Sequence, residues 1–151
     1  MMRRSSIQYV VLGILLVVMS EGSAPAGSNE RSDCTIERSP CAKFTSSGVQ
    51  VEFEITPRPV KAMQELEFIV TLRDGGIPVS SASLLLDLSM PGMFMGNNQP
   101  KLTEEQNGRY RGRGVIPKCP TGQRIWKALI AIARGHQVET VTYLFEVSDG
   151  N

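Results

Sequence analysis

VQVEFEIT, residues 49–56, alternates an apolar with a polar side chain at every position. A period of two is typical of a β-strand that turns one face to a core and the other to water. Pro57 and Pro59 end this strand, because proline has no N–H to offer a sheet ladder. Glu52 and Glu54 fall on the wet face, where we expect ordinary solvated carboxylates. The stretch therefore predicts a half-buried β-sheet.

Six further stretches follow the same reasoning. Strands are predicted at residues 66–72, 79–89, 101–104, 109–116, 125–133 and 138–147. Turn sequences separate several of them, at Asp74-Gly75-Gly76, Gln106-Asn107-Gly108 and Arg134-Gly135-His136. We therefore expect an all-β fold: an immunoglobulin-like antiparallel β-sandwich of about seven strands, preceded by a signal peptide.

The later strands contain residues whose places can be predicted. Trp126 shares an apolar face with Ala128 and Ile130, so we expect it in the core. Gly112 and Gly114 interrupt the strand at 109–116, which indicates either a bulge or the close approach of another backbone.

The N-terminus has the order of a secretory signal peptide. Arg3 and Arg4 precede an apolar run at residues 7–19, and small residues follow at 23–26. This run of 13 residues is short for a bilayer span, which takes about 20. We expect a signal peptide over 1–26, with an uncleaved anchor as the alternative. The protein is accordingly expected in the periplasm or otherwise exported, or else anchored to the cytoplasmic membrane and facing outward.

Two regions follow the leader. Residues 27–48 are predicted to form a flexible lead-in with Cys34 and Cys41, and residues 49–148 the β-sandwich domain. Removal of residues 1–26 leaves equal numbers of basic and acidic side chains. A net charge of zero gives no electrostatic basis for binding nucleic acid or an anionic membrane surface. Membrane contact is expected only if the N-terminal segment stays uncleaved.

Three cysteines leave one odd thiol after pairing in an oxidising compartment. Loop-closure entropy gives about 4.6 kcal/mol for a Cys34–Cys119 bridge and about 2.5 kcal/mol for Cys34–Cys41. Entropy measures stabilisation and does not decide which thiols are close, so all three pairings are open on this ground.

Strand alternation groups the loops of the predicted sandwich. Successive antiparallel strands reverse direction, so the loops after the first, third and fifth strands lie at one end. These are the loop at 57–63, the methionine-rich loop at 90–96 and the loop around Cys119. Cys119 and Met63 are therefore expected at the same end as the methionine-rich loop.

The same count favours one disulfide. Cys34 and Cys41 precede the first strand and are expected nearer the opposite end, together with His136. This placement favours a Cys34–Cys41 disulfide and leaves Cys119 as the odd thiol near the methionines. The alternatives are an inert buried thiol at Cys119 and a long-range bridge from Cys119 to Cys41.

The methionine-rich loop reads MPGMFMG over residues 90–96 and carries three of the seven methionines. Pro91-Gly92 can bend the chain sharply, which would let the thioethers of Met90, Met93 and Met95 converge. A thioether is a soft, neutral donor that suits Cu(I) among the common biological metals. Methionine also fills irregular gaps in packed structures, which is the alternative interpretation.

The chain offers little for catalysis. Its single histidine, His136, falls in a predicted turn, so no Ser/His/Asp or Cys/His set can be argued around it. The sequence has no phosphate-binding glycine loop and no C-x-x-C zinc spacing. We do not expect an enzyme.

The order of these motifs resembles a known family. LSMPGMFMG at 88–96 is followed by GRYRG at 108–112 and then by Trp126. This order is similar to the YtkA-like/FixH-like family of bacterial envelope proteins, over residues 49–147. The resemblance implies an immunoglobulin-like sandwich exported or anchored outside the cytoplasmic membrane; FixH-type members are linked to cation pumps that serve copper-containing respiratory oxidases. The short apolar run and the cysteines before the first strand depart from that pattern.

These observations predict an exported, non-enzymatic β-sandwich that binds Cu(I) for metal handling or delivery. The predicted ligands are Met90, Met93 and Met95, with Cys119 as a candidate fourth ligand. The alternative is a structural or interaction module of the cell envelope. In that case the Met-Pro-Gly-Met turn is architectural, and the partner is another envelope protein.

Overall fold

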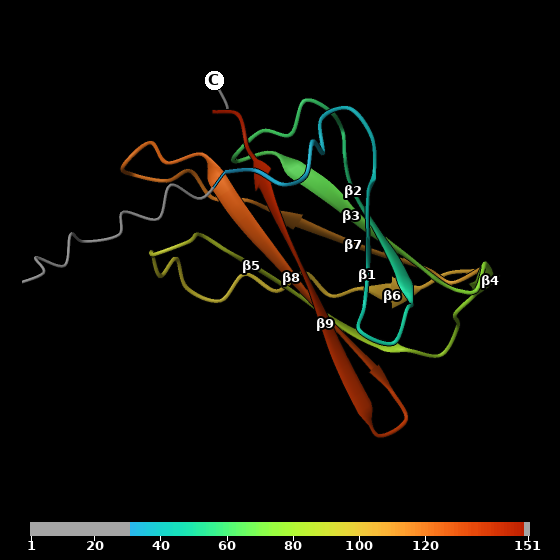
Figure 1. The fold of residues 1–151 in the computed structure, drawn as a ribbon. Helices are drawn as coiled ribbons and strands as arrows, with labels where there is room; N and C mark the ends of the chain where they lie inside the picture. Colours follow the sequence, from blue (N-terminus) through green and yellow to red (C-terminus); the bar gives the residue numbers. More distant parts are fainter. Residues whose placement is uncertain (1–30, 150–151) are drawn as a thin grey trace, which may run out of the picture.

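The computed structural model describes residues 31–149, which fold into two antiparallel β-sheets without a helix (Figure 1). The predicted signal peptide over 1–26 lies outside the described residues, as do the first residues of the predicted lead-in. The expected all-β, immunoglobulin-like sandwich is confirmed.

The larger sheet has the strand order β1-β2-β3-β7-β6, with β4 beside β3. The smaller sheet has the order β5-β8-β9, and every strand pair in both sheets is antiparallel. The strands are β1 (Cys41–Phe44), β2 (Gln50–Thr56), β3 (Glu65–Asp74), β4 (Ile77–Pro78), β5 (Ser83–Ser89), β6 (Thr103–Glu104), β7 (Arg109–Val115), β8 (Ile125–Arg134) and β9 (Gln137–Glu146).

One core fills the space between the two sheets. The alternation in β2 places Phe53 inward, where its ring centroid lies 5.3 Å from that of Tyr143 on β9. The Tyr143 hydroxyl donates a hydrogen bond of 2.7 Å to the Val51 carbonyl, so a buried polar atom is satisfied across the sandwich. Trp126 on β8 is fully buried, as predicted.

The structure has two strands that the sequence pattern did not predict, β1 and β4. β1 contains one large apolar residue, Phe44, which points outward, while Lys43 points inward. The Lys43 ammonium group pairs with Asp33, donates to the Thr142 carbonyl at 2.6 Å and lies 5.0 Å from the Tyr143 ring centroid. An amphipathic strand would turn its apolar side chain inward and its charged side chain outward, and β1 does the reverse. Its position therefore depends on these tertiary contacts and on its pairing with β2.

The strand predicted at 79–89 begins later than expected, at Ser83, where β5 starts. Residues 77–78 stay with β3 as β4, and the chain crosses to the smaller sheet before β5 begins. Tyr110 holds this crossing, since its hydroxyl donates to the Val79 carbonyl at 3.2 Å and accepts from the Ala82 N–H at 3.1 Å. Ser81 has a positive φ of 62° between these two partners, which breaks the extended strand.

The glycines of β7 make room for the connection between β5 and β6. A Cβ on Gly112 would lie 2.5 Å from the Lys101 carbonyl oxygen, and one on Gly114 would lie 3.0 Å from Pro100. The predicted close approach of another backbone is therefore correct at Gly112, whereas Gly114 makes room for the Pro100 side chain. The connection is also fixed to β5, because the Leu88 N–H donates to the Asn98 carbonyl at 2.9 Å.

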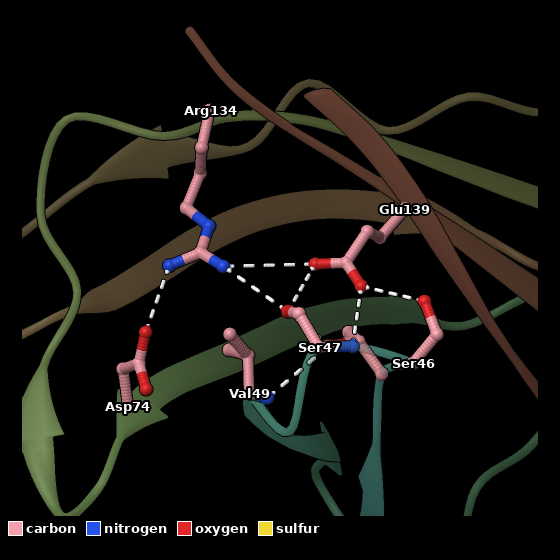
Figure 2. A network of polar contacts seen from close by, with 7 residues as sticks. Ser46, Ser47, Val49, Asp74, Arg134 and Glu139 are labelled. Carbon is pink, nitrogen blue, oxygen red and sulfur yellow. Dashed lines mark hydrogen bonds and ion pairs between the residues drawn. The ribbon is translucent and has the colours of Figure 1, made fainter. Parts of the chain in front are cut away.

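A polar network joins the turns at the end of the sandwich that holds the β1–β2 and β8–β9 hairpins (Figure 2). Glu139 accepts hydrogen bonds from the Ser46 hydroxyl, the Ser47 N–H and the Ser47 hydroxyl, at 2.9, 2.9 and 2.7 Å. Arg134 lies 3.1 Å from Asp74 at the end of β3 and 3.6 Å from Glu139. We call this the polar end.

The hydrogen bonds at the polar end change the acidity of Glu139. The Ser47 hydroxyl and then the Ser47 N–H stabilise the carboxylate, and together with the remaining donors they lower its pKa to about 2, against a smaller opposing effect of burial. The ionised Glu139 side chain on β9 therefore links the smaller sheet to the β1–β2 turn of the larger sheet. The exposed His136 lies in the β8–β9 turn at this end, as expected.

Candidate metal centre

Three loops meet at the opposite end of the sandwich. They are the β2–β3 loop, the methionine-rich start of the β5–β6 connection and the β7–β8 loop (Figure 1). The Met63 N–H of the first donates to the Ile116 carbonyl at the start of the third, at 2.8 Å. The Cys119 Sγ of the third lies 3.9 Å from the Met93 Sδ of the second. We call this the sulfur end; its loops are grouped as strand alternation predicts.

The methionine-rich loop makes a tight turn directly after β5. The Met93 N–H donates to the Met90 carbonyl at 3.2 Å, which closes an isolated antiparallel bridge between these two residues. Gly92 allows the turn because its φ is +73°, a value that favours glycine. Met90 is buried in the core, whereas Met93 and Met95 are half-buried and pack against it.

Cys119 is a buried, unpaired cysteine with a polar neighbour. Its Sγ lies 3.1 Å from the Thr121 hydroxyl oxygen. The hydrogen bond from Thr121 is the main cause that lowers the pKa of the Cys119 thiol, assisted by the backbone N–H groups of Thr121, Gln123 and Gly122 and opposed by burial. The loop therefore favours the thiolate, which is the form that binds metals.

The structure brings some of the predicted ligands together more closely than others. Met93 and Cys119 are in sulfur–sulfur contact, and Met90 is joined to Met93 through the backbone while its side chain packs in the core. Met95 belongs to the same loop and is half-buried against the core. Met63 shares this end, but its side chain is 69% exposed.

The distance between the two sulfurs suits a shared soft ion. With metal–sulfur bonds of about 2.3 Å, sulfurs 3.9 Å apart would subtend an angle of roughly 115° at a metal. That angle lies between tetrahedral and trigonal, so Cys119 and Met93 fit two positions of a three- or four-coordinate site. Within residues 31–149 no group of three or more His, Cys, Asp or Glu side chains could hold a metal.

The cysteine pairing is as predicted, but its predicted location is wrong. Cys34 and Cys41 form a disulfide with a Cα–Cα distance of 5.8 Å. The Cys34 N–H, however, donates at 3.0 Å to the carbonyl of Leu144, near the end of β9 and therefore at the sulfur end. The physical reason is that β1 pairs antiparallel with β2, so the chain reverses direction once more than predicted before β2. Residues that precede β1 therefore lie at the sulfur end and not at the opposite end.

The predicted lead-in is also wrong where the structure describes it. Cys34 and Ile36 are buried in the core, and β1 is part of the larger sheet. Asp33 receives the Leu144 N–H on its carboxylate at 2.8 Å, so this segment covers the edge of β9. Residues 31–48 therefore belong to the sandwich.

Sequence reasoning missed Thr121 as the partner of the thiol. Its only signal is the turn sequence Cys119-Pro-Thr-Gly122, in which Gly122 has a φ of +75° and its N–H donates to the Cys119 carbonyl at 3.1 Å. This tight turn folds the N–H groups and the hydroxyl back toward Sγ.

No known protein family matches this chain, and no curated protein matches it in sequence. No helix in the described residues has the length and apolar character needed to cross a membrane.

Proposed function

We propose that this chain is an exported, non-enzymatic β-sandwich protein that binds Cu(I) for metal handling or delivery. The single observation that carries the proposal is the 3.9 Å contact between Cys119 Sγ and Met93 Sδ, which come from loops 26 residues apart. Met90 and Met95 belong to the same loop as Met93 and are the proposed further donors.

The chemistry of the donors supports a soft, monovalent ion. Thiolate and thioether sulfurs favour Cu(I), whereas zinc sites use several Cys, His or carboxylate ligands. The lowered pKa of the Cys119 thiol favours the ligating form, and its burial limits access by oxidants. The resemblance of residues 88–96 and 108–112 to the YtkA-like/FixH-like proteins supports a location outside the cytoplasmic membrane and a link to copper.

The test is an anaerobic Cu(I) titration against a competing chelator. Met93→Leu keeps the side-chain volume and removes the sulfur, so it should fold and bind Cu(I) more weakly. Met63→Leu is the matched control, because Met63 lies at the same end with an exposed side chain and should leave affinity unchanged. Wild-type affinity in both Met93→Leu and Cys119→Ser would remove the proposed site.

A second candidate function is a structural or interaction module of the cell envelope. The observation that favours it is the burial of Met90 and its backbone bridge to Met93, which a purely architectural turn would also need. In that case a folded wild-type protein would fail to compete for Cu(I), and the search would move to an envelope protein partner.

A further inference from the structure

Apolar side chains are exposed around the sulfur end. Phe94 at the tip of the methionine-rich loop is 87% exposed, and Met63 in the β2–β3 loop is 69% exposed. Val115 at the end of β7 is exposed as well, and its carbonyl accepts a hydrogen bond from the Asn98 side chain at 3.1 Å. Together with the bond from Met63 to Ile116, this contact links the three positions around one end of the molecule.

The charges near these side chains are of both signs. Lys61 and Lys118 lie within two or three residues of Met63 and Val115, and neither has an ion-pair partner among residues 31–149. Glu146 is neutralised by Arg124 at 3.2 Å. Two acids lie close to Lys61, because the Glu37 carboxylate accepts the Val60 N–H at 2.8 Å and Asp149 follows Ser148, which bridges to Lys61.

The chain enters the sandwich at this same end. The N–H groups of Asp33 and Cys34 both donate to the Leu144 carbonyl at 3.0 Å, and Leu144 pairs with Lys127. Lys127 pairs in turn with Ser89, the residue before the methionine-rich loop. Eleven residues separate the apolar run at 7–19 from Arg31, and a chain of this length reaches at most about 40 Å.

We propose that the sulfur end faces a lipid bilayer whenever the apolar run at 7–19 occupies the membrane, with Phe94 and Met63 inserted into the interface. Lys61 and Lys118 then lie near the headgroups, and the apolar side chains, not the charges, hold this end at the interface. This inference does not depend on Cu(I) binding. A bilayer would bury the exposed apolar side chains of the sulfur end, which is also the end where the chain enters the sandwich.

A bilayer fits this surface better than a protein partner does. A stable protein interface buries about 1,200 Å² or more, and three separated apolar side chains do not supply the centre of such an interface. A tether of eleven residues raises the effective concentration of the domain at the membrane, so a weak insertion is enough.

The test uses the full chain in lipid nanodiscs of zwitterionic and anionic lipid, with methyl-labelled methionine, isoleucine and valine and a gadolinium-chelate lipid. Methyl signals of Met63 and Met95 should broaden several-fold more than those of Ile77 and Val138, which are exposed at the opposite end. Equal broadening at both ends, no broadening at Met63, or release of the chain from the discs would overturn the proposal.

A matched pair of variants identifies the contact. Phe94→Ser should reduce the excess broadening at Met63 by up to about tenfold, because it removes the largest inserted side chain. Phe44→Ser is the control, since Phe44 is 67% exposed and lies on β1 toward the polar end. Undiminished broadening in Phe94→Ser would contradict the insertion. The broadening is measured without Cu(I), so failure here is distinct from failure of the proposed metal site.

Discussion

The two ends of this sandwich are closed by different chemistry. The polar end is held by directional bonds from serine, arginine and carboxylate side chains to one another (Figure 2). The sulfur end is held by packing of soft side chains, with a single sulfur–sulfur contact and a short backbone bridge between Met90 and Met93. The Glu139, Ser46, Ser47 and Arg134 side chains at the polar end bond to one another. The Cys119 and Met93 sulfurs lie 3.9 Å apart and are the donors of the proposed Cu(I) site.

The largest effect is expected from removing the thiol at the sulfur end. Cys119→Ser should lower Cu(I) affinity by at least about 100-fold, the upper end of what loss of even an outer-shell partner costs at metal sites. Glu139→Gln, at the polar end, should leave the affinity unchanged. Competition titrations on both variants measure this contrast, and equal losses would show that the two ends are not independent.

Acidity should affect metal binding through the sulfur end alone. The thiol must lose its proton to bind a metal, so Cu(I) affinity should fall as pH falls below the pKa of Cys119. Because that pKa is lowered, the fall should begin at a lower pH than for an ordinary thiol near 8.5. Titrations from pH 8 to 5 test this. The affinity remaining in Cys119→Ser should be nearly independent of pH, and a parallel slope would assign the proton to another group.

Stability in acid should depend on the polar end. The folded pKa of Glu139 is about 2, below its value in the unfolded chain, so its stabilising contribution is complete above about pH 4.5 and is lost as pH falls toward 2. Thermal unfolding followed by Trp126 fluorescence should show a steeper decline for wild type than for Glu139→Gln in that window. Identical slopes would mean that Ser46 and Ser47 do not hold the carboxylate in solution.

The smallest effect is expected from Met93→Leu on folding. This change keeps volume in a half-buried position and should cost less than about 1.5 kcal/mol in the free energy of unfolding. Chemical denaturation measures it. A much larger loss would mean that the thioether is needed for the turn itself, and would favour the architectural interpretation.

Much of the fold could be predicted because alternation specifies a strand with one buried face. VQVEFEIT and the later strands were found in this way. β1 was not predicted because Phe44 points outward and Lys43 inward. This arrangement depends on Asp33, which lies 10 residues before Lys43, and on Tyr143 across the core. The crossing of the chain between the two sheets after β4 was not predicted for a similar reason. The Tyr110 hydroxyl that bonds to it belongs to β7, a strand distant in the sequence.

The candidate site could be predicted to the level of loops and no further. Alternation placed the loops of Met93 and Cys119 at one end, but the contact itself depends on side-chain packing that no spacing reveals. The location of Cys34 was predicted wrongly because one missed strand reverses every earlier direction. Metal binding itself and the identity of the metal stay predictions.

The way in which the β5–β6 connection closes has a consequence for protein engineering. The Leu88 N–H donates to the Asn98 carbonyl at 2.9 Å, and the chain beyond Asn98 packs closely against Gly112, which has no side chain. Both ends of the loop are therefore fixed by contacts that do not involve its tip. We therefore expect residues 91–97 to tolerate replacement while the two sheets keep their structure. Turns carrying other donor atoms can be grafted there to test the proposed metal binding, while neither sheet has to be redesigned.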